Sequence, residues 1–436
     1  MLSKEQNERL TRVGPGTPMG ELLRRYWYPV AFTRELDEWP IRKVRLLGED
    51  FALWKTPQGG YAIVQEACPH RAASLIYGVV EEDGLRCGYH GWKFDCSGNC
   101  IEQPAEPGKS AFMRHVKAFA GKAEALGGMV WAYIGPDPAP VLPRFDVFVD
   151  PGFVDVGHSM LPCNWLQIME NSVDPHHVEW LHGRYFEFLG AQQGFVAPKS
   201  FQKKHLKVGF DAMEWGILKR RVLEGHTEED DDWAVGHPLV FPHSMRVGGA
   251  GIDQMQIRVP IDDTTTWAMF YSNHHPDGLD TYPEQIYPVD YEYKWLDDKG
   301  RHIVDYIEGQ DVMAWVSQGK IADRTSEHIG KSDIGVIMIR RMFKAQMARV
   351  EAGEDPTVAF TRVPQERIEL PCEKKKFGAG IDFALAWLDM GSTRYSPALD
   401  TLRKIHLEAA RARGEMPSSD EYAVRQPFDA GAPRTM

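Results

Sequence analysis

The pattern of apolar and polar positions divides the chain into a helical start, a β-rich part and a longer mixed part. Within residues 26–143, short apolar runs such as VRLLGEDFALWKT, GYAIVQEAC and GGMVWAYIG are broken by Gly, Asn and Asp. Such runs predict short antiparallel strands joined by turns. Before them, residues 1–25 predict a short helix that starts at Thr17 or Pro18 and carries Glu21 in its first turn.

The longer part of the chain follows a proline-rich boundary, PDPAPVLP at residues 136–143. Residues 200–275 alternate strand-like runs with turns, which predicts a broad antiparallel sheet covered by helices. Surface helices are expected at 336–353 and 393–414, and a loop or lid at 276–300. The fold class expected is therefore α+β, with a small antiparallel β domain and a larger domain of helix-grip type.

Composition and charge exclude several classes of protein. The 436 residues suggest two or three domains, and 43% apolar with 26% charged residues is typical of globular proteins. A net charge of −12 argues against a general nucleic-acid binder. No apolar run is long enough to span a bilayer, and the N-terminus does not resemble a signal peptide. The six cysteines form no disulfide framework, so a cytoplasmic location and no membrane partner are expected.

Two short loops each supply one cysteine and one histidine. They read Cys68-x-His70 and Cys87-x-x-His90. Four such ligands hold either one tetrahedral zinc ion or a Rieske [2Fe–2S] cluster, in which both cysteines bind one iron and both histidines the other. Zinc sites usually place two cysteines in one loop and two histidines in another. Because each loop here is mixed, the spacing favours the cluster.

A second group of histidines follows in NWLQIMENSVDPHHVEWLH, residues 164–182. Pro175 can open a helix that Asp174 caps. His177 and His182 are five residues apart, which leaves them roughly 140° apart around an ideal α-helix. A distorted or ending helix could bring them together. His176, six residues from His182, is the competing ligand and fits one helical face even less well.

These motifs together resemble the Rieske ring-hydroxylating oxygenases, in the large subunit that carries catalysis. CPHRAASL…GLRCGYHGWKFD resembles the cluster segment, and Asp174, His177 and His182 fit the family's Asp-x-x-His-x-x-x-x-His motif. Residues 301–333 resemble the phthalate dioxygenase branch, which implies Asp311 as the third iron ligand. A solvated acid at the start of a helix is the alternative for Asp311, and Glu308 is the near competitor. Asp323 is expected to cap a turn or to pair with Arg324.

The resemblance implies two cofactors and an assembly. Cys68, His70, Cys87 and His90 would bind the Rieske [2Fe–2S] cluster, and His177, His182 and Asp311 would bind Fe(II). Asp174 would connect His177 to His90 of a neighbouring subunit, which requires subunits packed head to tail. A homotrimer, or two trimers stacked as a hexamer, follows from this arrangement.

The resemblance further implies a terminal oxygenase. It would use O₂ and electrons from a separate NAD(P)H-dependent reductase, a flavin and plant-type [2Fe–2S] protein, to dihydroxylate an aromatic carboxylate of the phthalate, halobenzoate or phenoxybenzoate type. Candidate anchors for the carboxylate are Arg246, Arg221 and Lys207, with arginine preferred for its two-bond grip. A monooxygenase or O-demethylase acting on a similar acid is the alternative. Chain length and the second motif argue against an electron carrier and a zinc-stabilised binding protein.

Four segments are expected on this basis. They are a helical segment, 1–25, that packs on the catalytic domain, a Rieske domain, 26–143, a catalytic domain, 144–415, and a C-terminal tail, 416–436.

Overall fold

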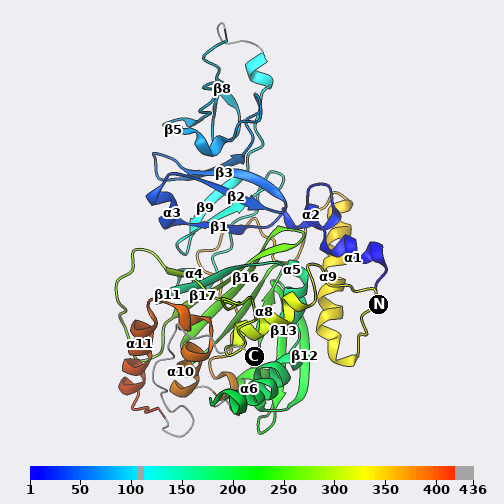
Figure 1. Ribbon diagram of the computed structural model, residues 1–436, viewed down its shortest axis with the longest axis vertical. Coiled ribbons are helices and arrows are strands. Elements are labelled where there is room, and N and C mark those ends of the chain that lie inside the picture. The colour runs from blue at the N-terminus through cyan, green and yellow to red at the C-terminus, as the bar shows by residue number, and fades with distance from the viewer. Residues whose placement is uncertain (107–111, 196, 198, 379, 418–436) are drawn as a thin grey trace.

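The computed structural model describes residues 1–106, 112–195, 197, 199–378 and 380–417. Most of the tail expected at 416–436 lies outside these residues. The described part is elongated, with three small sheets stacked towards one end and one large sheet with its helices at the other (Figure 1). This is the α+β class expected from the sequence.

The N-terminal helices pack against the larger part of the molecule. They are α1, Lys4–Thr11, and α2, Pro18–Leu23. As expected, Thr17 is the N-cap of α2, since its side chain accepts a hydrogen bond from Gly20 N. Helix α1 is held by the side chain of Asn7, which donates to the carbonyl oxygen of Ala322 at 3.0 Å.

The small sheets form the β-rich end. Their order is β1-β10-β9, β2-β3-β4 and β5-β6-β7-β8, and all of their pairs are antiparallel. The strands are β1 Tyr28–Phe32, β2 Ile41–Leu46, β3 Glu49–Lys55, β4 Tyr61–Gln65, β5 Val79–Glu81, β6 Gly84–Arg86, β7 Lys93–Phe94, β8 Cys100–Glu102, β9 Lys122–Leu126 and β10 Met129–Tyr133. Three short helices accompany them, namely α3 Thr33–Glu38, η1 Leu75–Tyr77 and η2 Phe112–His115.

The larger part is built on one eight-stranded sheet of order β12-β13-β14-β15-β16-β17-β11-β18. Its strands are β11 Phe153–Leu161, β12 His205–Met213, β13 Gly216–Leu223, β14 His237–Val240, β15 Ser244–Gly249, β16 Ile252–Asp262, β17 Thr265–His274 and β18 Val289–Glu292. All pairs are antiparallel except β11 with β18. The segment 276–300 is thus not wholly a loop, because β18 joins the edge of the sheet.

Helices accompany this sheet. They are α4 Asp146–Val149, α5 Trp165–Ser172, η3 Val178–Tyr185, α6 Phe186–Gln193, η4 Lys199–Gln202, α7 Asp231–Ala234, α8 Ile307–Ser317, η5 Lys331–Asp333, α9 Ile334–Glu351, η6 Lys376–Gly378, α10 Ile381–Met390, η7 Ser392–Tyr395 and α11 Leu399–Ala412. In the part of the chain that the structure describes, no helix is both long and apolar enough to cross a bilayer.

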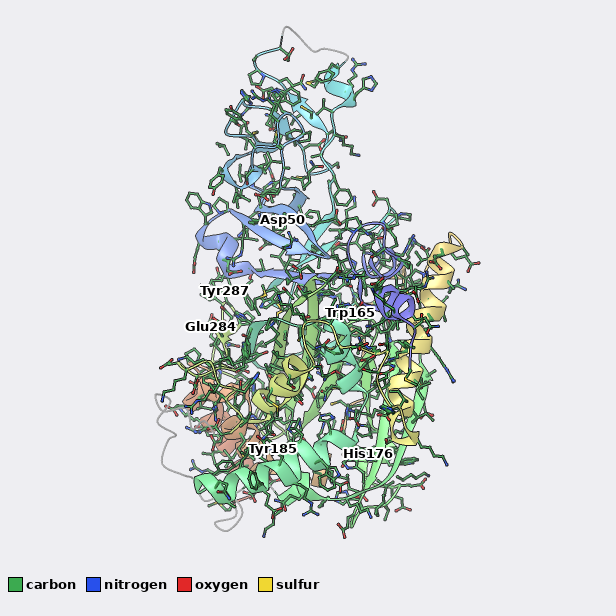
Figure 2. All side chains as sticks on the ribbon, turned by 45° about the vertical axis from the view of Figure 1, so that its right-hand side comes forward. Asp50, Trp165, His176, Tyr185, Glu284 and Tyr287 are labelled. Atoms are coloured by element: carbon green, nitrogen blue, oxygen red, sulfur yellow. The ribbon has the colours of Figure 1, made fainter. Side chains whose placement is uncertain are left out.

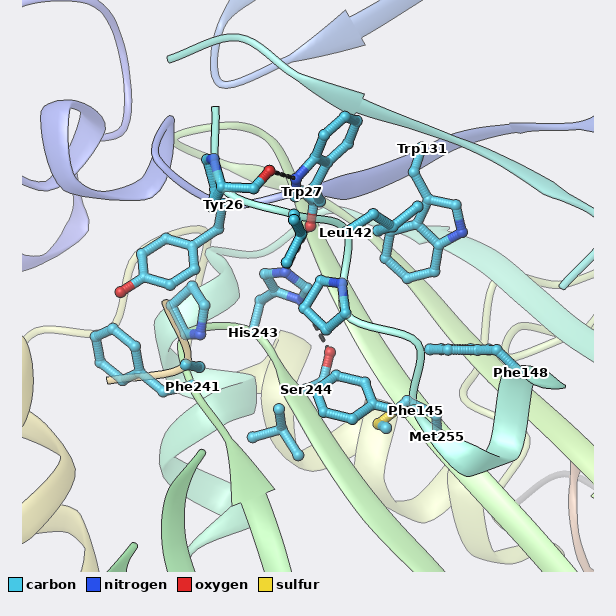
Figure 3. Close-up of a pocket in the computed structure, with 16 residues that line it drawn as sticks. Tyr26, Trp27, Trp131, Leu142, Phe145, Phe148, Phe241, His243, Ser244 and Met255 are labelled. Carbon is cyan, nitrogen blue, oxygen red and sulfur yellow. Dashed lines mark hydrogen bonds between the residues drawn. The ribbon is translucent and has the colours of Figure 1, made fainter. Parts of the chain in front are cut away.

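The two parts meet at an apolar pocket (Figure 3). Trp27 and Trp131 line it from the β-rich end, and Met255 lines it from β16. His243 bridges the junction, because Nε2–H donates to the carbonyl oxygen of Trp27 at 3.0 Å and Nδ1 lies 2.9 Å from the hydroxyl of Ser244. Both ring nitrogens are therefore satisfied, so this histidine joins the two parts of the fold.

Candidate functional site

The Cys–His loops lie in the β-rich end, one before β5 and one between β6 and β7. Cys68 and Cys87 are buried, whereas His70 and His90 are half-exposed. The two imidazoles lie side by side, with ring centroids 4.6 Å apart, and His70 stacks on Trp92 at 4.3 Å. The loops therefore present two inner thiols and two outer imidazoles.

The thiols are also neighbours. Burial raises the pKa of Cys68 to about 11, and the nearby Cys87 thiol adds to the rise. The backbone N–H groups of His70 and Arg71 oppose this rise by hydrogen bonding to the Cys68 sulfur. Such bonds stabilise a thiolate ligand and help set the potential of a cluster.

The spread of these four ligands differs from that of a single-ion site. Ligands of one tetrahedral zinc ion lie within about 4 Å of one another. Among the described residues, the one group of three or more His, Cys, Asp or Glu ligand atoms within 4.8 Å is His177, His182 and Asp311. No three of the four Cys and His ligand atoms therefore lie within 4.8 Å of one another, which agrees better with a two-iron cluster than with a single ion.

The helix that carries the histidine pair is wound as a π-helix over Val178–Tyr185. Hydrogen bonds from residue i to i+5 place residues five apart nearly above one another, which an α-helix does not. The rings of His177 and His182 accordingly lie 5.2 Å apart. The five-residue spacing of His177 and His182 required a distorted helix, and the distortion is the wider π-helical turn.

The outer nitrogen of each histidine is held by a carbonyl-type oxygen. His177 Nδ1–H donates to the backbone oxygen of Asp174 at 2.5 Å, and His182 Nδ1–H donates to Gln310 Oε1 at 2.9 Å. A proton on Nδ1 leaves the lone pair on Nε2 free for a metal. Gln310, which sequence reasoning missed, therefore fixes the tautomer of His182. Its place directly before the candidate ligand Asp311 was the available signal.

Asp311 completes the group from α8. Its Oδ1 lies 3.2 Å from His182 Nε2 and 3.8 Å from His177 Nε2. The same oxygen is buried and has no hydrogen-bond partner among the described atoms. A buried carboxylate oxygen without a partner is costly unless a ligand satisfies it. Two Nε2 lone pairs and one such oxygen are the donor set of a mononuclear Fe(II) site, so the residues fit this metal.

The competing residues are engaged by other partners, although Glu308 also lines the cavity beside the triad. The ring of His176 faces His205, with ring centroids 5.6 Å apart. Glu308 accepts hydrogen bonds from the backbone N–H and the hydroxyl of Ser392, at 2.7 and 3.1 Å. Asp323 caps its own turn by accepting from Thr325 N.

Asp174 does cap the helix, because its Oδ1 accepts from His176 N at 2.9 Å. Its carboxylate remains about one-third exposed, and Oδ2 lies 4.0 Å from His177 Nδ1. One oxygen is thus used within the chain, and the other is available to a partner.

A cavity opens beside the triad, and Arg221 is one of its lining residues. Its guanidinium is buried and pairs with Asp232 at 3.1 Å. Other lining residues are Asn171, Lys219, His237, Gln254, Gln256, Lys376 and Phe377. Gln254 and Gln256 face this cavity, whereas Met255 faces the apolar pocket on the opposite side of β16, as strand alternation requires.

Two of the three proposed carboxylate anchors do not reach this cavity. Met245 and Val247 line it, so Arg246 between them points to the other face of β15, where its Nη2 pairs with Asp253 at 2.5 Å. Lys207 lies on the edge strand, half-exposed, and pairs with Glu228 at 2.7 Å. Of the three residues, Arg221 alone lines the cavity.

Comparison with known proteins places the chain in a family. Residues 26–120 match the family described as Rieske [2Fe-2S] domain, and residues 263–370 match LigXa C-terminal domain like. The 5,5'-dehydrodivanillate O-demethylase oxygenase subunit of Sphingobium sp. is 43% identical over 85% of this chain and 86% of its own length. The phthalate 4,5-dioxygenase oxygenase subunit of Pseudomonas putida is 32% identical over 92% and 97%.

Solved structures share the fold. NdmA of Pseudomonas putida CBB5, solved with caffeine, covers 76% of this chain and 93% of its own with a TM-score of 0.55 and 19% identity. The fold and the sequence relatives together define an oxygenase component with a Rieske domain. The chain belongs to the Rieske non-haem iron oxygenases, as an oxygenase (alpha) subunit of the group that includes the phthalate 4,5-dioxygenase. Its cofactors are accordingly a Rieske [2Fe–2S] cluster and a mononuclear iron.

Proposed function

We propose that the protein is a terminal oxygenase that dihydroxylates an aromatic carboxylate, with O₂ as co-substrate and electrons from a separate flavin and plant-type [2Fe–2S] reductase. The observation that supports this most is the largely buried group His177, His182 and Asp311 beside a cavity with cationic walls. When bound there, iron supplies the centre at which O₂ is activated. The chain orients the two imidazoles, excludes bulk water and holds the substrate. We place it in the cytoplasm, because its cysteines are free.

We assign Cys68, His70, Cys87 and His90 to the cluster, within a Rieske domain at 26–143. The remaining domain boundaries are proposed as 1–25, 144–415 and 416–436.

The positions of the two sites support a trimer with head-to-tail contacts. Strands β5 and β8 are the two edges of the sheet that holds the second cluster loop, and they lie at one end of the molecule, whereas α8 with Asp311 lies in the other part (Figure 1). Figure 2 likewise shows His176, beside the proposed iron ligand His177, far below Asp50 of the β-rich end. Electrons that leave the cluster would therefore reach iron more directly in a neighbouring subunit. In that arrangement the free oxygen of Asp174 accepts a hydrogen bond from the neighbour's His90.

Exposed aromatic residues beside both sites agree with such a contact. Tyr89, between the cluster ligands Cys87 and His90, is 60% exposed, and Trp180, between His177 and His182, is 67% exposed. Large aromatic side chains at this exposure are typical of interface anchors.

Mixed trimers test whether electrons pass from the cluster of one subunit to the iron of its neighbour. His177→Ala keeps the cluster and loses the iron site, and Cys87→Ser does the reverse, so each variant alone should be inactive. In any mixed head-to-tail trimer, one junction joins an intact cluster to an intact iron site, so we expect about one-third of wild-type turnover. The two variants would be co-expressed with different affinity tags, and the mixed trimers would be purified by one tag and then by the other. Differently tagged wild-type chains are the control, and a pure mixed trimer without turnover would contradict transfer between subunits.

O-demethylation is the second candidate reaction, favoured by the 43% identity to an O-demethylase subunit. Both reactions consume one O₂, two electrons and two protons. Dihydroxylation places both oxygen atoms on the ring, whereas demethylation releases formaldehyde and water and leaves a phenol. The two reactions are distinguished by analysing the products formed under ¹⁸O₂ from matched benzoates with and without a methoxy group. A doubly labelled diol supports our proposal, and formaldehyde with a phenol supports the second candidate.

A further inference from the structure

Three cations line the cavity beside the iron triad, and two of them are paired within the chain. Arg221 pairs with Asp232 at 3.1 Å, and Lys376 lies 3.4 Å from Glu373. The third, Lys219, forms no ion pair with any described residue. The cavity wall thus carries one lysine without a direct ion pair in the described part of the chain. Asp174 and Glu373 act on its charge from farther away, and Glu308 also lines the cavity.

Lys219 is held in place although it forms no direct ion pair with the described residues. The residue is 4% exposed, and its Nζ donates to the carbonyl oxygen of Ser172 at 2.9 Å. An ammonium group has three donors, so this bond leaves two of them for a ligand. A buried charge without a partner is strongly unfavourable, and proteins keep one where a ligand supplies the opposite charge.

A second donor lies on the same side of the strand. Lys219 and Arg221 are two apart on β13, so both side chains project from one face of the sheet. Nη2 of Arg221 is buried, has no hydrogen-bond partner among the described atoms and lies 3.7 Å from Glu373 Oε1. One ammonium and one guanidinium nitrogen that share a face match the two oxygens of a carboxylate.

We propose that Lys219, together with Arg221, binds the carboxylate of the aromatic substrate and so determines the preference for acids over neutral rings. This assignment rests on the proposed oxygenase function, and it replaces Arg246 and Lys207, which lie outside the cavity. The carboxylate is held at β13 while the ring extends towards His177 and His182.

The titration of Lys219 agrees with this geometry. Burial, followed by the neighbouring cations Arg221 and Lys376, lowers the pKa of Lys219 to about 7. A carboxylate bound beside the ammonium would raise this pKa again and keep the group charged near neutral pH.

Binding of acids and of their methyl esters tests the proposal. The probes are benzoate, phthalate and 3-methoxybenzoate with the corresponding methyl esters, and the readout is the Kd from calorimetry on the metal-loaded enzyme. Lys219→Gln removes the charge and keeps an N–H donor for Ser172 O. Lys219→Arg keeps the charge. Lys207→Gln is the matched control, because it removes a lysine charge from the neighbouring strand on the surface.

We expect Lys219→Gln to weaken acid binding by about 10- to 100-fold and ester binding by less than about 3-fold. Lys219→Arg should restore most of the acid affinity, and Lys207→Gln should change neither Kd. Equal losses for acid and ester would show a structural role for Lys219 and overturn the proposal, while turnover by the wild type would leave the oxygenase function intact. If the variants fail to fold, the Kd values of the wild-type enzyme still test the proposal. Methyl esters that bind the wild type as tightly as the acids would overturn it.

Discussion

The two proposed iron sites are built from similar candidate ligands in opposite ways. The cluster loops draw four ligands from one short stretch, Cys68 to His90, and leave both imidazoles half-exposed at one end of the molecule. The triad draws two histidines from a π-helix and one aspartate from α8, and Gln310 beside that aspartate is 128 residues from His182. The triad is also far better shielded, with His182 only 4% exposed at its side chain.

This difference matches two tasks. An electron-storing site works at a surface where partners approach, so exposed imidazoles at its edge are useful. A site that activates O₂ next to an organic substrate requires an open coordination face inside a water-poor cavity. The chain thus separates electron entry from chemistry, and the following predictions test that separation.

Removing one ligand from either site should have the largest effect. We expect His177→Ala to abolish turnover and lose the mononuclear iron while the visible absorption of the cluster persists. Cys87→Ser should lose the absorption as well as turnover. His176→Ala is the matched control, because this neighbouring ring faces His205 and should leave the iron content unchanged. Turnover that survives in His177→Ala would disprove the iron assignment.

Asp174→Asn should have the next largest effect, because it alters the connection between the sites and leaves both sets of ligands intact. The amide can still cap the helix, so stability should be unchanged. We expect both metals to remain bound and coupled hydroxylation to fall by about 100-fold, since the carboxylate that we propose accepts a hydrogen bond from the neighbour's His90 is lost. Rapid-mixing spectroscopy of cluster reoxidation measures this step. A normal rate of cluster reoxidation would show that Asp174 only caps the helix.

Gln310→Leu should have a smaller effect, confined to the triad. The leucine leaves His182 Nδ1–H without its acceptor and frees the ring to change tautomer. We expect iron affinity to fall by about tenfold, with cluster absorption unchanged. Titration of the iron-free enzyme with Fe(II) measures this loss, with Gln318→Leu at the exposed end of the same helix as control. Equal affinities in the two variants would remove Gln310 from the site.

The sequence predicted much of the fold because its signals were local. The Thr17 cap and the helix after it, the strands of the β-rich end and the broad sheet follow from turn residues and alternation. The Rieske domain could be recognised for the same reason, since its proposed cluster ligands lie in one stretch of chain.

The remainder required tertiary structure. The π-helix that aligns His177 with His182 contradicts the default helical period, and sequence alone does not indicate the widening. Whether Arg246 or Lys219 reaches the cavity depends on the register of β13 and β15, which decides the face on which each side chain lies.

Metal and sulfide analysis of the purified chain tests the central claim most directly. Two separate iron sites in one polypeptide predict about three irons and two acid-labile sulfides per chain, together with a red-brown colour that bleaches on reduction. A colourless protein with one zinc ion per chain and no sulfide would contradict the account.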